Sequence, residues 1–466
     1  MQKLWLRAWR KDKCLSPALL AIAVSLAPSR KKMEIATKDK WKTIPMDNPK
    51  RLDVSMFLNF EQLNKLKLGL VPNQMEDKWF VYFNNDTIYF NRSWTGYEIF
   101  KAKLNLNESG CEINEFSVEQ NLEKYKEADD ERNIYSFKNH IEYLSNREIN
   151  NPVKNGLWGL VIGDALGVPV EFKSRDYLKQ NPLTDMIGFG TYNQPEGTWS
   201  DDSSLAFCLA DELTKELNLQ EIGNSFVRWF YENHWTPHGK VFDIGISTRE
   251  AIIRLKKGEK AELAGSWEEN SNGNGSLMRI LPLLFEVQKI KGRKEKYELI
   301  KKVSSITHGH IRSCLACFYY LEIASFLSSQ IKYPITDAYK VANHSLLKLT
   351  EEMDINPKEI ELFDRITGGN LAELQENSIQ SSGYVIHTLE ASIWCLLTTK
   401  SYKEAVLKAI NLGEDTDTTG AVVGGLAGLF YGINSIPKEW IGKIARKKDI
   451  EELTNKLSDK YKIARC

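Results

Sequence analysis

The stretch GEDTDTTGAVVGGLAGLFYG, from Gly413 to Gly432, determines the architecture expected for most of this chain. Acidic and hydroxyl side chains stand directly before an apolar segment, in which glycines recur every fourth residue at Gly420, Gly424, Gly428 and Gly432. This spacing gives a helix one smooth face that another backbone can approach closely. Because the segment is too short to span a bilayer, we expect it to pack tightly against a soluble neighbour. Such packing would bring the acidic cluster towards other helix ends.

A second acidic cluster precedes another apolar segment, in GTWSDDSSLAFCLADEL from Gly197 to Leu213. Ser, Thr and Asp are the preferred helix N-caps, so capping remains an open interpretation of either cluster alone. A cap needs one oxygen acceptor, however, and each cluster offers at least three within four residues. Adjacent carboxylates repel one another unless a cation or a shared proton neutralises them, and hard divalent ions require several oxygen ligands.

Two such clusters brought together predict a two-metal site for Mg²⁺ or Mn²⁺. An EF-hand loop starting at Asp415 is excluded, because its twelfth position is Leu426 where a bidentate Glu is needed. The candidate metal ligands are Ser200, Asp201, Asp202, Asp415, Asp417 and Thr418.

The sequence around these clusters is helical in pattern. Apolar residues follow i, i+3, i+4 spacing from residue 151 to residue 446, with no run of strands. We therefore predict an all-α bundle over 151–446 with functional loops between its helices, followed by a C-terminal helical tail at 447–466.

The preceding part of the chain has a different texture. Short alternating segments over 41–148 predict a small α+β domain of unknown role, whose strand aromatics are either core residues or the lining of a ligand site. Residues 1–40 form a basic and apolar extension, which we expect to be disordered rather than a signal for export. Within 41–148 the expected elements are a hairpin from Trp79–Phe83 and Thr87–Phe90, strands at Glu98–Leu106 and Ile113–Val118, and a helix within Glu119–Arg147.

Composition excludes several classes of protein. Hydrophobic residues make up 42% of the 466 residues and charged residues 27%, so the chain can bury a core and is not disordered. Lys+Arg and Asp+Glu both number 62, which leaves no net positive charge for a nucleic-acid partner, and no segment is a stable membrane span. The seven scattered cysteines favour a reducing, cytoplasmic location, and Cys314 and Cys317 are expected to be core residues on one helix face.

Three further stretches are candidates for the rest of a site. GLVIGDALGVPVEF ends with Glu171 between two apolar residues, which favours a raised carboxyl pKa. NGNGSLMRILPL is a Gly/Asn-rich loop whose backbone N–H groups suit a phosphate. In SSITHGHIRS, His308 and His310 stand at a helix start, where they can bind zinc, pair with phosphate or cap the helix.

Taken together and in this order, GDALGVPVEF, GTWSDDSS, NGNGSLMR, THGH and GEDTDTTGAVVGGLAGLFYG resemble the ADP-ribosylglycohydrolase family, over about residues 151–446. The resemblance implies an orthogonal bundle of helices with two divalent cations, Mg²⁺ or Mn²⁺, at the base of a cleft for ADP-ribose. It also implies catalytic roles for Glu171 and Asp202, and departs from the family pattern at Glu414, where Gly is usual. By the same resemblance the metal ligands are Ser200, Asp201, Asp202, Asp415, Asp417 and Thr418, and the substrate contacts are Asn274, Gly275, Ser276, Met278 and His308.

The implied reaction is removal of ADP-ribose from a modified side chain, most directly arginine, through an oxocarbenium-like state and an activated water. Three alternatives stay open: hydrolysis of O-linked or small-molecule ADP-ribose, a catalytically silent ADP-ribose-binding protein, and a metal hydrolase that attacks phosphorus. The product separates the last, because free ADP-ribose means glycosidic cleavage and AMP means attack at phosphorus. The expected partner is an ADP-ribosylated protein or an ADP-ribose-containing small molecule, and the chain is expected to be a monomer.

Overall fold

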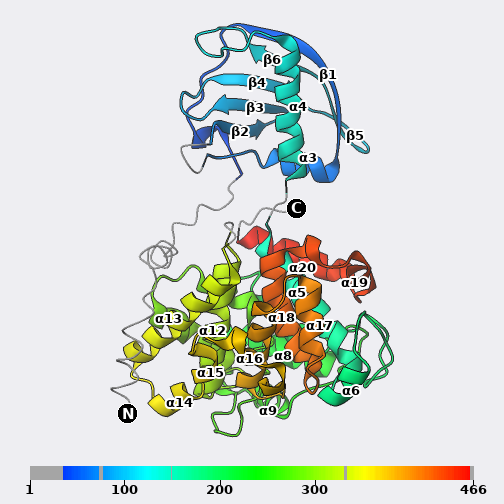
Figure 1. Cartoon of the computed structure of the whole chain (residues 1–466), viewed down its shortest axis with the longest axis vertical. Coiled ribbons are helices and arrows are strands. Elements are labelled where there is room, and N and C mark those ends of the chain that lie inside the picture. Colours follow the sequence, from blue (N-terminus) through cyan, green and yellow to red (C-terminus); the bar gives the residue numbers. More distant parts are fainter. Residues whose placement is uncertain (1–34, 73–76, 148–149, 330–332, 462–466) are drawn as a thin grey trace. The chain divides into compact units, whose positions relative to one another are not determined.

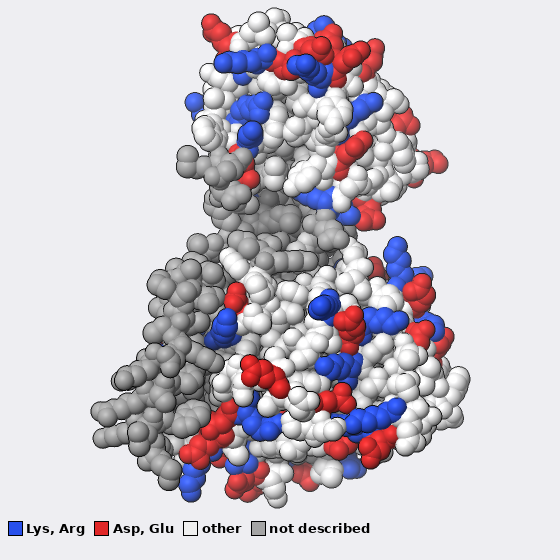
Figure 2. Space-filling model, viewed as in Figure 1, with Lys and Arg blue, Asp and Glu red and all other residues white. Residues whose placement is uncertain are grey.

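The computed structural model describes residues 35–72, 77–147, 150–329 and 333–461, which form two compact units. The first unit contains the described residues up to Asn151, and the second runs from Pro152 to Lys460. The extension predicted at 1–40 lies outside the described residues as far as residue 34. Residues 35–40 belong to the first unit, because Ala36 is fully buried and its N–H donates to the Leu68 carbonyl at 2.9 Å. On the face drawn in Figure 2, basic and acidic side chains are intermingled in both units.

The first unit is an antiparallel sheet with the order β1-β6-β4-β3-β2, in which β5 also pairs with β6. Helix α4 lies across the strands (Figure 1), and its Phe137, Ile141 and Leu144 are buried against Phe90, Phe100 and the other core residues of the sheet. The elements are β1 Pro49–Asn59, α3 Phe60–Lys67, β2 Trp79–Asn84, β3 Thr87–Arg92, β4 Glu98–Lys103, β5 Asn105–Asn107, β6 Gly110–Glu119 and α4 Asp130–Asn146.

The predicted hairpin is confirmed, with Asn84 paired to Thr87 across a turn where Asn85 has φ of 57°. The prediction of helix from Glu119 is wrong at its start. Glu119 ends β6, and its buried carboxylate accepts backbone N–H groups of Asp47, Asn48 and Asn121. The helix begins only at Asp130, after the N-cap Asp129.

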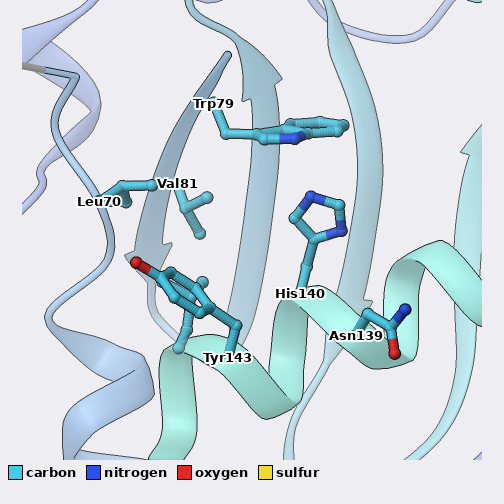
Figure 3. A pocket seen from close by; sticks show the side chains of 7 residues that line it. Leu70, Trp79, Val81, Asn139, His140 and Tyr143 are labelled. Carbon is cyan, nitrogen blue, oxygen red and sulfur yellow. The ribbon is translucent and has the colours of Figure 1, made fainter. Parts of the chain in front are cut away.

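The aromatic residues of the first unit divide between the core, the surface and a hollow at one sheet edge. Phe80 is fully buried and Trp94 is 73% exposed, whereas Trp79 packs between the Arg92 guanidinium and the His140 ring. Figure 3 shows the hollow, a cavity of about 260 Å³ beside α4. It is lined by Leu70, Trp79, Val81, Asn139, His140, Tyr143 and Leu144.

The second unit is mostly helical, as predicted, and the orthogonal arrangement of its bundle stays a prediction. Its named elements between residues 150 and 461 include no strand, and no helix among the described residues meets the length and hydropathy of a bilayer span. Its helices are α5 Pro152–Gly167, α6 Arg175–Gln180, α7 Asp201–Glu212, α8 Leu219–Glu232, α9 Ile246–Lys256, α10 Leu284–Val287, α11 Arg293–Ser304, α12 Ile311–Leu327, α13 Ile335–Met353, α14 Pro357–Glu361, α15 Asp364–Thr367, α16 Val385–Leu397, α17 Tyr402–Ile410, α18 Thr416–Tyr431, α19 Lys438–Lys443 and α20 Lys447–Lys460.

The helix pair α5 and α18 is the centre of this unit. A Cβ added at Gly163 would lie 2.0 Å from the Gly420 carbonyl oxygen, and one at Gly159 would lie 2.2 Å from that of Gly424. The smooth face predicted from the glycine spacing therefore packs directly on another helix backbone. Gly432 is not part of this face, because it follows the helix end as a C-cap with φ of 83°.

Two smaller predictions are also resolved in the second unit. Cys314 and Cys317 are buried and free within α12, so their core role is confirmed. The C-terminal tail forms α20, which is not solvated all round: Ile450, Leu453 and Leu457 are buried where it packs on α5 and α7.

Candidate active site

A buried carboxylate of α5 shapes the first acidic cluster. Asp164 accepts the backbone N–H of Ser200 at 2.9 Å, and the backbone N–H and hydroxyl of Ser203 at 3.0 and 2.5 Å. Burial raises the pKa of Asp164 to about 6, although these hydrogen bonds act in the opposite direction. The sequence motif GDALG contains this residue, but nothing in its spacing predicted that it would organise the turn before α7.

The two acidic clusters meet in the folded chain, as the family resemblance implied. The Thr418 hydroxyl donates to Asp202 Oδ2 at 3.2 Å, although 216 residues separate them. The Ser200 hydroxyl also donates to Asp202 Oδ2, at 3.1 Å, and its oxygen caps α7 by accepting the Asp202 N–H. Capping is therefore part of the role of Ser200. Asp415 occupies the N-cap position of α18 but makes no side-chain capping bond there.

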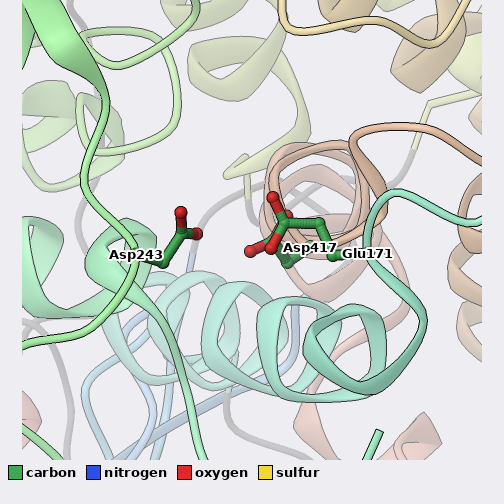
Figure 4. A group of neighbouring side chains, drawn as sticks. All are labelled: Glu171, Asp243 and Asp417. Atoms are coloured by element: carbon green, nitrogen blue, oxygen red, sulfur yellow. The ribbon is translucent and has the colours of Figure 1, made fainter. Parts of the chain in front are cut away.

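A third carboxylate that the sequence did not identify completes the centre. Glu171, Asp243 and Asp417 each place an oxygen within 4.8 Å of the other two. Figure 4 shows Glu171 and Asp417 side by side and Asp243 facing them from a separate loop. Asp243 precedes α9 and has φ of 48°. It is a single acidic residue in a loop, so only the tertiary fold reveals its place.

Several carboxylate oxygens in this centre are buried without a protein partner. Among the described residues, Glu171 Oε2, Asp202 Oδ1 and Asp417 Oδ2 have no hydrogen bond. Such buried oxygens are costly unless a proton or a cation satisfies them. Burial raises the pKa of Glu171 to about 9, and the charges of Asp243 and Asp415 add to this rise.

The pKa values of the other carboxyl groups in this centre are also raised. Burial is the largest cause at each one, and neighbouring carboxylates add to it at Asp201, Asp202 and Asp417, whose pKa values lie well above the ordinary range. Burial also raises the pKa values of Asp243 and Asp415. With its pKa of about 9, Glu171 therefore retains its proton at neutral pH in the cation-free structure.

The Gly/Asn-rich loop lies against the second acidic cluster. Asn274 donates from Nδ2 to Asp415 Oδ2 and to Thr388 Oγ1, both at 2.8 Å. A Cβ at Gly275 would lie 2.7 Å from Cε1 of His308, so the loop and the His308 ring are in close contact. These positions are consistent with one site that includes Asn274, Gly275 and His308.

The remaining predicted contacts of this loop are less accessible. Ser276 is fully buried, and its hydroxyl accepts from Ser304 Oγ at 2.9 Å, so the side chain faces the core. Met278 is only 4% exposed. His310, by contrast, caps α12 by accepting the Arg312 N–H, as one interpretation of its motif expected.

Tyr192 lies beside the third carboxylate and contacts two further aromatic rings. The ring of Tyr192 lies 5.1 Å from that of Phe242 and 6.4 Å from that of Phe172, which is 68% exposed. Burial and the charges of Asp243 and Glu171 raise the pKa of Tyr192, so its hydroxyl stays protonated beside both carboxyl groups. Neither Tyr192 nor Phe242 was predicted from the sequence.

Comparison with known proteins identifies the family of this chain. The family model of the ADP-ribosylglycohydrolases matches residues 145–465. The chain belongs to the ADP-ribosylglycohydrolase family. Two relatives are called ADP-ribosylarginine hydrolase Tri1: the one from Serratia proteamaculans (strain 568) is 33% identical over 65% of this chain and 78% of its own length, and the one from Pseudomonas putida (strain GB-1) is 31% identical over 66% and 78%.

More distant relatives cover a similar share of the chain. The ADP-ribosyl-[dinitrogen reductase] glycohydrolase of Rhodospirillum rubrum is 26% identical over 63% of this chain and 90% of its own length. A solved structure described as an ADP-ribosylglycohydrolase-related protein complex has a TM-score of 0.53 and 27% identity, and covers 68% of this chain and 99% of that one.

One arginine fixes the loops that carry this family's second acidic cluster. Arg175 donates from Nε to the Leu412 carbonyl at 2.9 Å, from Nη1 to that of Glu376 at 2.9 Å, and from Nη2 to that of Ile379 at 2.6 Å. Three separate chain segments therefore meet at one guanidinium. The segment that contains Leu412 leads directly to Asp415.

Proposed function

We propose that this ADP-ribosylglycohydrolase uses two divalent cations, Mg²⁺ or Mn²⁺, to hydrolyse the bond between ADP-ribose and a modified arginine side chain. The observation that carries this proposal is the group of buried carboxylates that meet in one place with unpartnered oxygens. The two Tri1 relatives, which are named as ADP-ribosylarginine hydrolases, support the choice of arginine.

The donor set fits hard divalent ions. It consists of carboxylate and hydroxyl oxygens, which are the ligands that Mg²⁺ and Mn²⁺ prefer. The unpartnered oxygens of Asp202 and Asp417 are available for such ions. Bound cations would neutralise the like charges and lower the pKa of water at the site. The residues that would hold them are Ser200, Asp201 and Asp202 from the start of α7 and Asp415, Asp417 and Thr418 from the start of α18.

Glu171 is suited to accept the proton of the attacking water. Its side chain is 4% exposed, its Oε2 has no protein partner among the described residues, and it lies within 4.8 Å of Asp417. Its pKa of about 9 belongs to the cation-free centre. Nearby positive charge would lower that pKa towards neutrality, where a carboxylate serves best as a general base.

Asp243 and the aromatic group offer a binding place for a guanidinium. A carboxylate can accept two parallel hydrogen bonds from a guanidinium, and aromatic faces stack on its plane. Asp243 has Tyr192 and Phe242 beside it, and the exposed Phe172 adds a third ring. A serine-linked substrate would leave Asp243 without a cation partner.

The test is release of ADP-ribose from an arginine-ADP-ribosylated protein, with Mg²⁺, with Mn²⁺ and with EDTA. We expect metal-dependent release that the Asp415→Ala/Asp417→Ala double mutant lacks. The matched control is Asp176→Ala/Glu216→Ala, which removes two exposed carboxylates of the same unit and should leave the activity unchanged.

Each other outcome corrects a different part of the proposal. Cleavage of serine-linked or O-acetyl-ADP-ribose alone would mean that the linkage is wrong. AMP as the product would mean attack at phosphorus, and no reaction with any ADP-ribose substrate would leave a binding protein. Full activity in EDTA would refute the cation requirement.

A further inference from the structure

A chain of buried hydrogen bonds leads from a guanidinium to the His308 ring. Arg279 is fully buried, with its guanidinium 4.7 Å from the centre of the Phe226 ring. Its Nη2 donates to the Val303 carbonyl at 3.1 Å and to Thr307 Oγ1 at 2.8 Å. Thr307 Oγ1 in turn lies 2.9 Å from His308 Nδ1.

The direction of these bonds follows from the donors available. A guanidinium has only N–H groups, so Thr307 Oγ1 must accept from Arg279. The Thr307 hydroxyl is fully buried and must then place its own proton on an acceptor. Among the described residues, the only further hydrogen-bond partner of this hydroxyl is His308 Nδ1. Nδ1 is therefore the acceptor, and the proton of a neutral ring resides on Nε2.

The ring stays neutral for a separate reason. Burial lowers the pKa of His308 to about 3, and the nearby Arg279 cation acts in the same direction. Both ring nitrogens would carry protons only in strongly acidic solution, so at neutral pH a single tautomer is defined by the bond at Nδ1.

The Nε2 edge of the ring faces the candidate active site. A Cβ at Gly275 would lie 3.4 Å from Nε2, and one at Gly273 would lie 3.5 Å from it. Asn274, between these glycines, bonds Asp415. No hydrogen bond joins Nε2 to another group in the described parts of the chain, which leaves this donor for a ligand.

We propose that Thr307 and Arg279 are positioning residues that hold His308 as the Nε2–H tautomer, so that Nε2 donates a hydrogen bond to an oxygen of bound ADP-ribose. The ordinary alternative is a buried histidine that only packs. Arg279 argues against pure packing, because its Nε and Nη1 are buried with no hydrogen-bond partner among the described residues. Such orphaned donors cost stability, so the guanidinium is poorly explained by stability alone. The ligand in this proposal rests on the proposed function, whereas the tautomer does not.

The tautomer is tested by the ¹⁵N chemical shifts of the His308 ring in the full chain, assigned by comparison with His308→Gln. We expect an unprotonated Nδ1 and a protonated Nε2 in the wild type and in Thr307→Ser, which keeps the hydroxyl. Thr307→Val has nearly the same shape without the hydroxyl, so we expect its ring to lose the single-tautomer signature. A wild-type ring protonated at Nδ1 would overturn the proposal even if Thr307→Val failed to fold.

The affinity for ADP-ribose provides the second test of the proposal. In Thr307→Val, titration with ADP-ribose and Mg²⁺ should show about a tenfold weaker Kd, and the KM for substrate should rise with little change in kcat. Thr307→Ser should restore both values. A Thr307→Val protein with wild-type ADP-ribose affinity would overturn the donor role of Nε2. If wild-type protein bound no ADP-ribose, the proposed function would fail and the donor role with it, while the ring shifts would still decide the tautomer.

Discussion

Replacing one glycine between the central helices should damage both the fold and the site. In Gly163→Ala, the new Cβ would lie 2.0 Å from the Gly420 carbonyl oxygen and 2.5 Å from its carbon. Carbon and oxygen atoms in contact normally stay about 3.3 Å apart, so α5 and α18 would have to separate by about 1 Å. Neither atom of Gly420 can rotate away, because both belong to the backbone.

The cost of that separation can be bracketed. Overpacking a core costs about 1–3 kcal/mol, and the better helix propensity of Ala returns about 1 kcal/mol. Because the clash is with backbone, we expect a net loss of about 2 kcal/mol in the free energy of unfolding. Glu171 follows α5 through the short turn Val168–Val170, and Asp417 lies in the first turn of α18. A shift of about 1 Å between them should reduce kcat/KM about a hundredfold.

The assays are urea unfolding of the full chain and ADP-ribose release for kcat/KM, the latter with Mn²⁺ affinity measured by calorimetry on the same samples. Gly442→Ala is the control, because a Cβ there meets no atom within 4 Å, and it should change none of these properties by much. Gly156→Ala should give an intermediate loss, since the atoms nearest to its Cβ would be side-chain carbons of Leu281 and Leu429 at 3.2 and 3.3 Å. Wild-type stability and wild-type Mn²⁺ affinity in Gly163→Ala would refute the packing argument.

Three further predictions concern the site itself. In EDTA, the melting temperature should fall as pH rises from about 5 to 9. The folded state keeps a proton on Glu171, whose pKa is about 9, whereas the unfolded state releases this proton near the ordinary pKa of Glu. The free energy of unfolding should fall by about 1.4 kcal/mol per pH unit for each such proton. A melting temperature that rises between about pH 5 and 9 would contradict this prediction. Asp243→Asn should reduce kcat/KM at least about tenfold more for an arginine-linked substrate than for a serine-linked one, and equal losses would point to a general role. Arg175→Met should lower the free energy of unfolding by about 2 kcal/mol, because it removes three part-buried hydrogen bonds to separate chain segments and takes the donor from the Ile379 carbonyl, and an unchanged urea midpoint would count against this.

Much of the fold follows from local patterns in the sequence. The helices of the second unit have apolar residues at helical spacing, and the glycine spacing of α18 correctly predicted its close packing. Strand β1 and helix α3 were not predicted. β1 is an edge strand whose side chains are mostly exposed, with Val54 and Leu58 as its buried residues, so its hydrophobic alternation is weak.

The site was predictable only where its residues are clustered in sequence. Asp201 and Asp202, or Asp415 and Asp417, have more oxygens than a cap needs, and this excess alone marks them as ligand candidates. Asp243 has no such neighbours. Its role depends on a loop that the fold places opposite Glu171, and no local property of the sequence encodes that placement.

The connection between Glu171 and Asp415 shows how the chain holds repelling groups together. Phe172 and Glu414, their immediate neighbours, have φ of 63° and 65°, a left-handed conformation that costs a non-glycine residue about 1 kcal/mol. The Phe172 N–H donates to the Glu414 carbonyl at 2.7 Å, and the Glu414 N–H donates to the Lys173 carbonyl at 2.8 Å. These two backbone hydrogen bonds keep the carboxylates of Glu171 and Asp415 near each other, although burial and mutual repulsion disfavour two charged groups there. Strain and repulsion at the same place oppose folding, so packing elsewhere in the unit has to offset them, and bound cations would turn the repulsion into attraction.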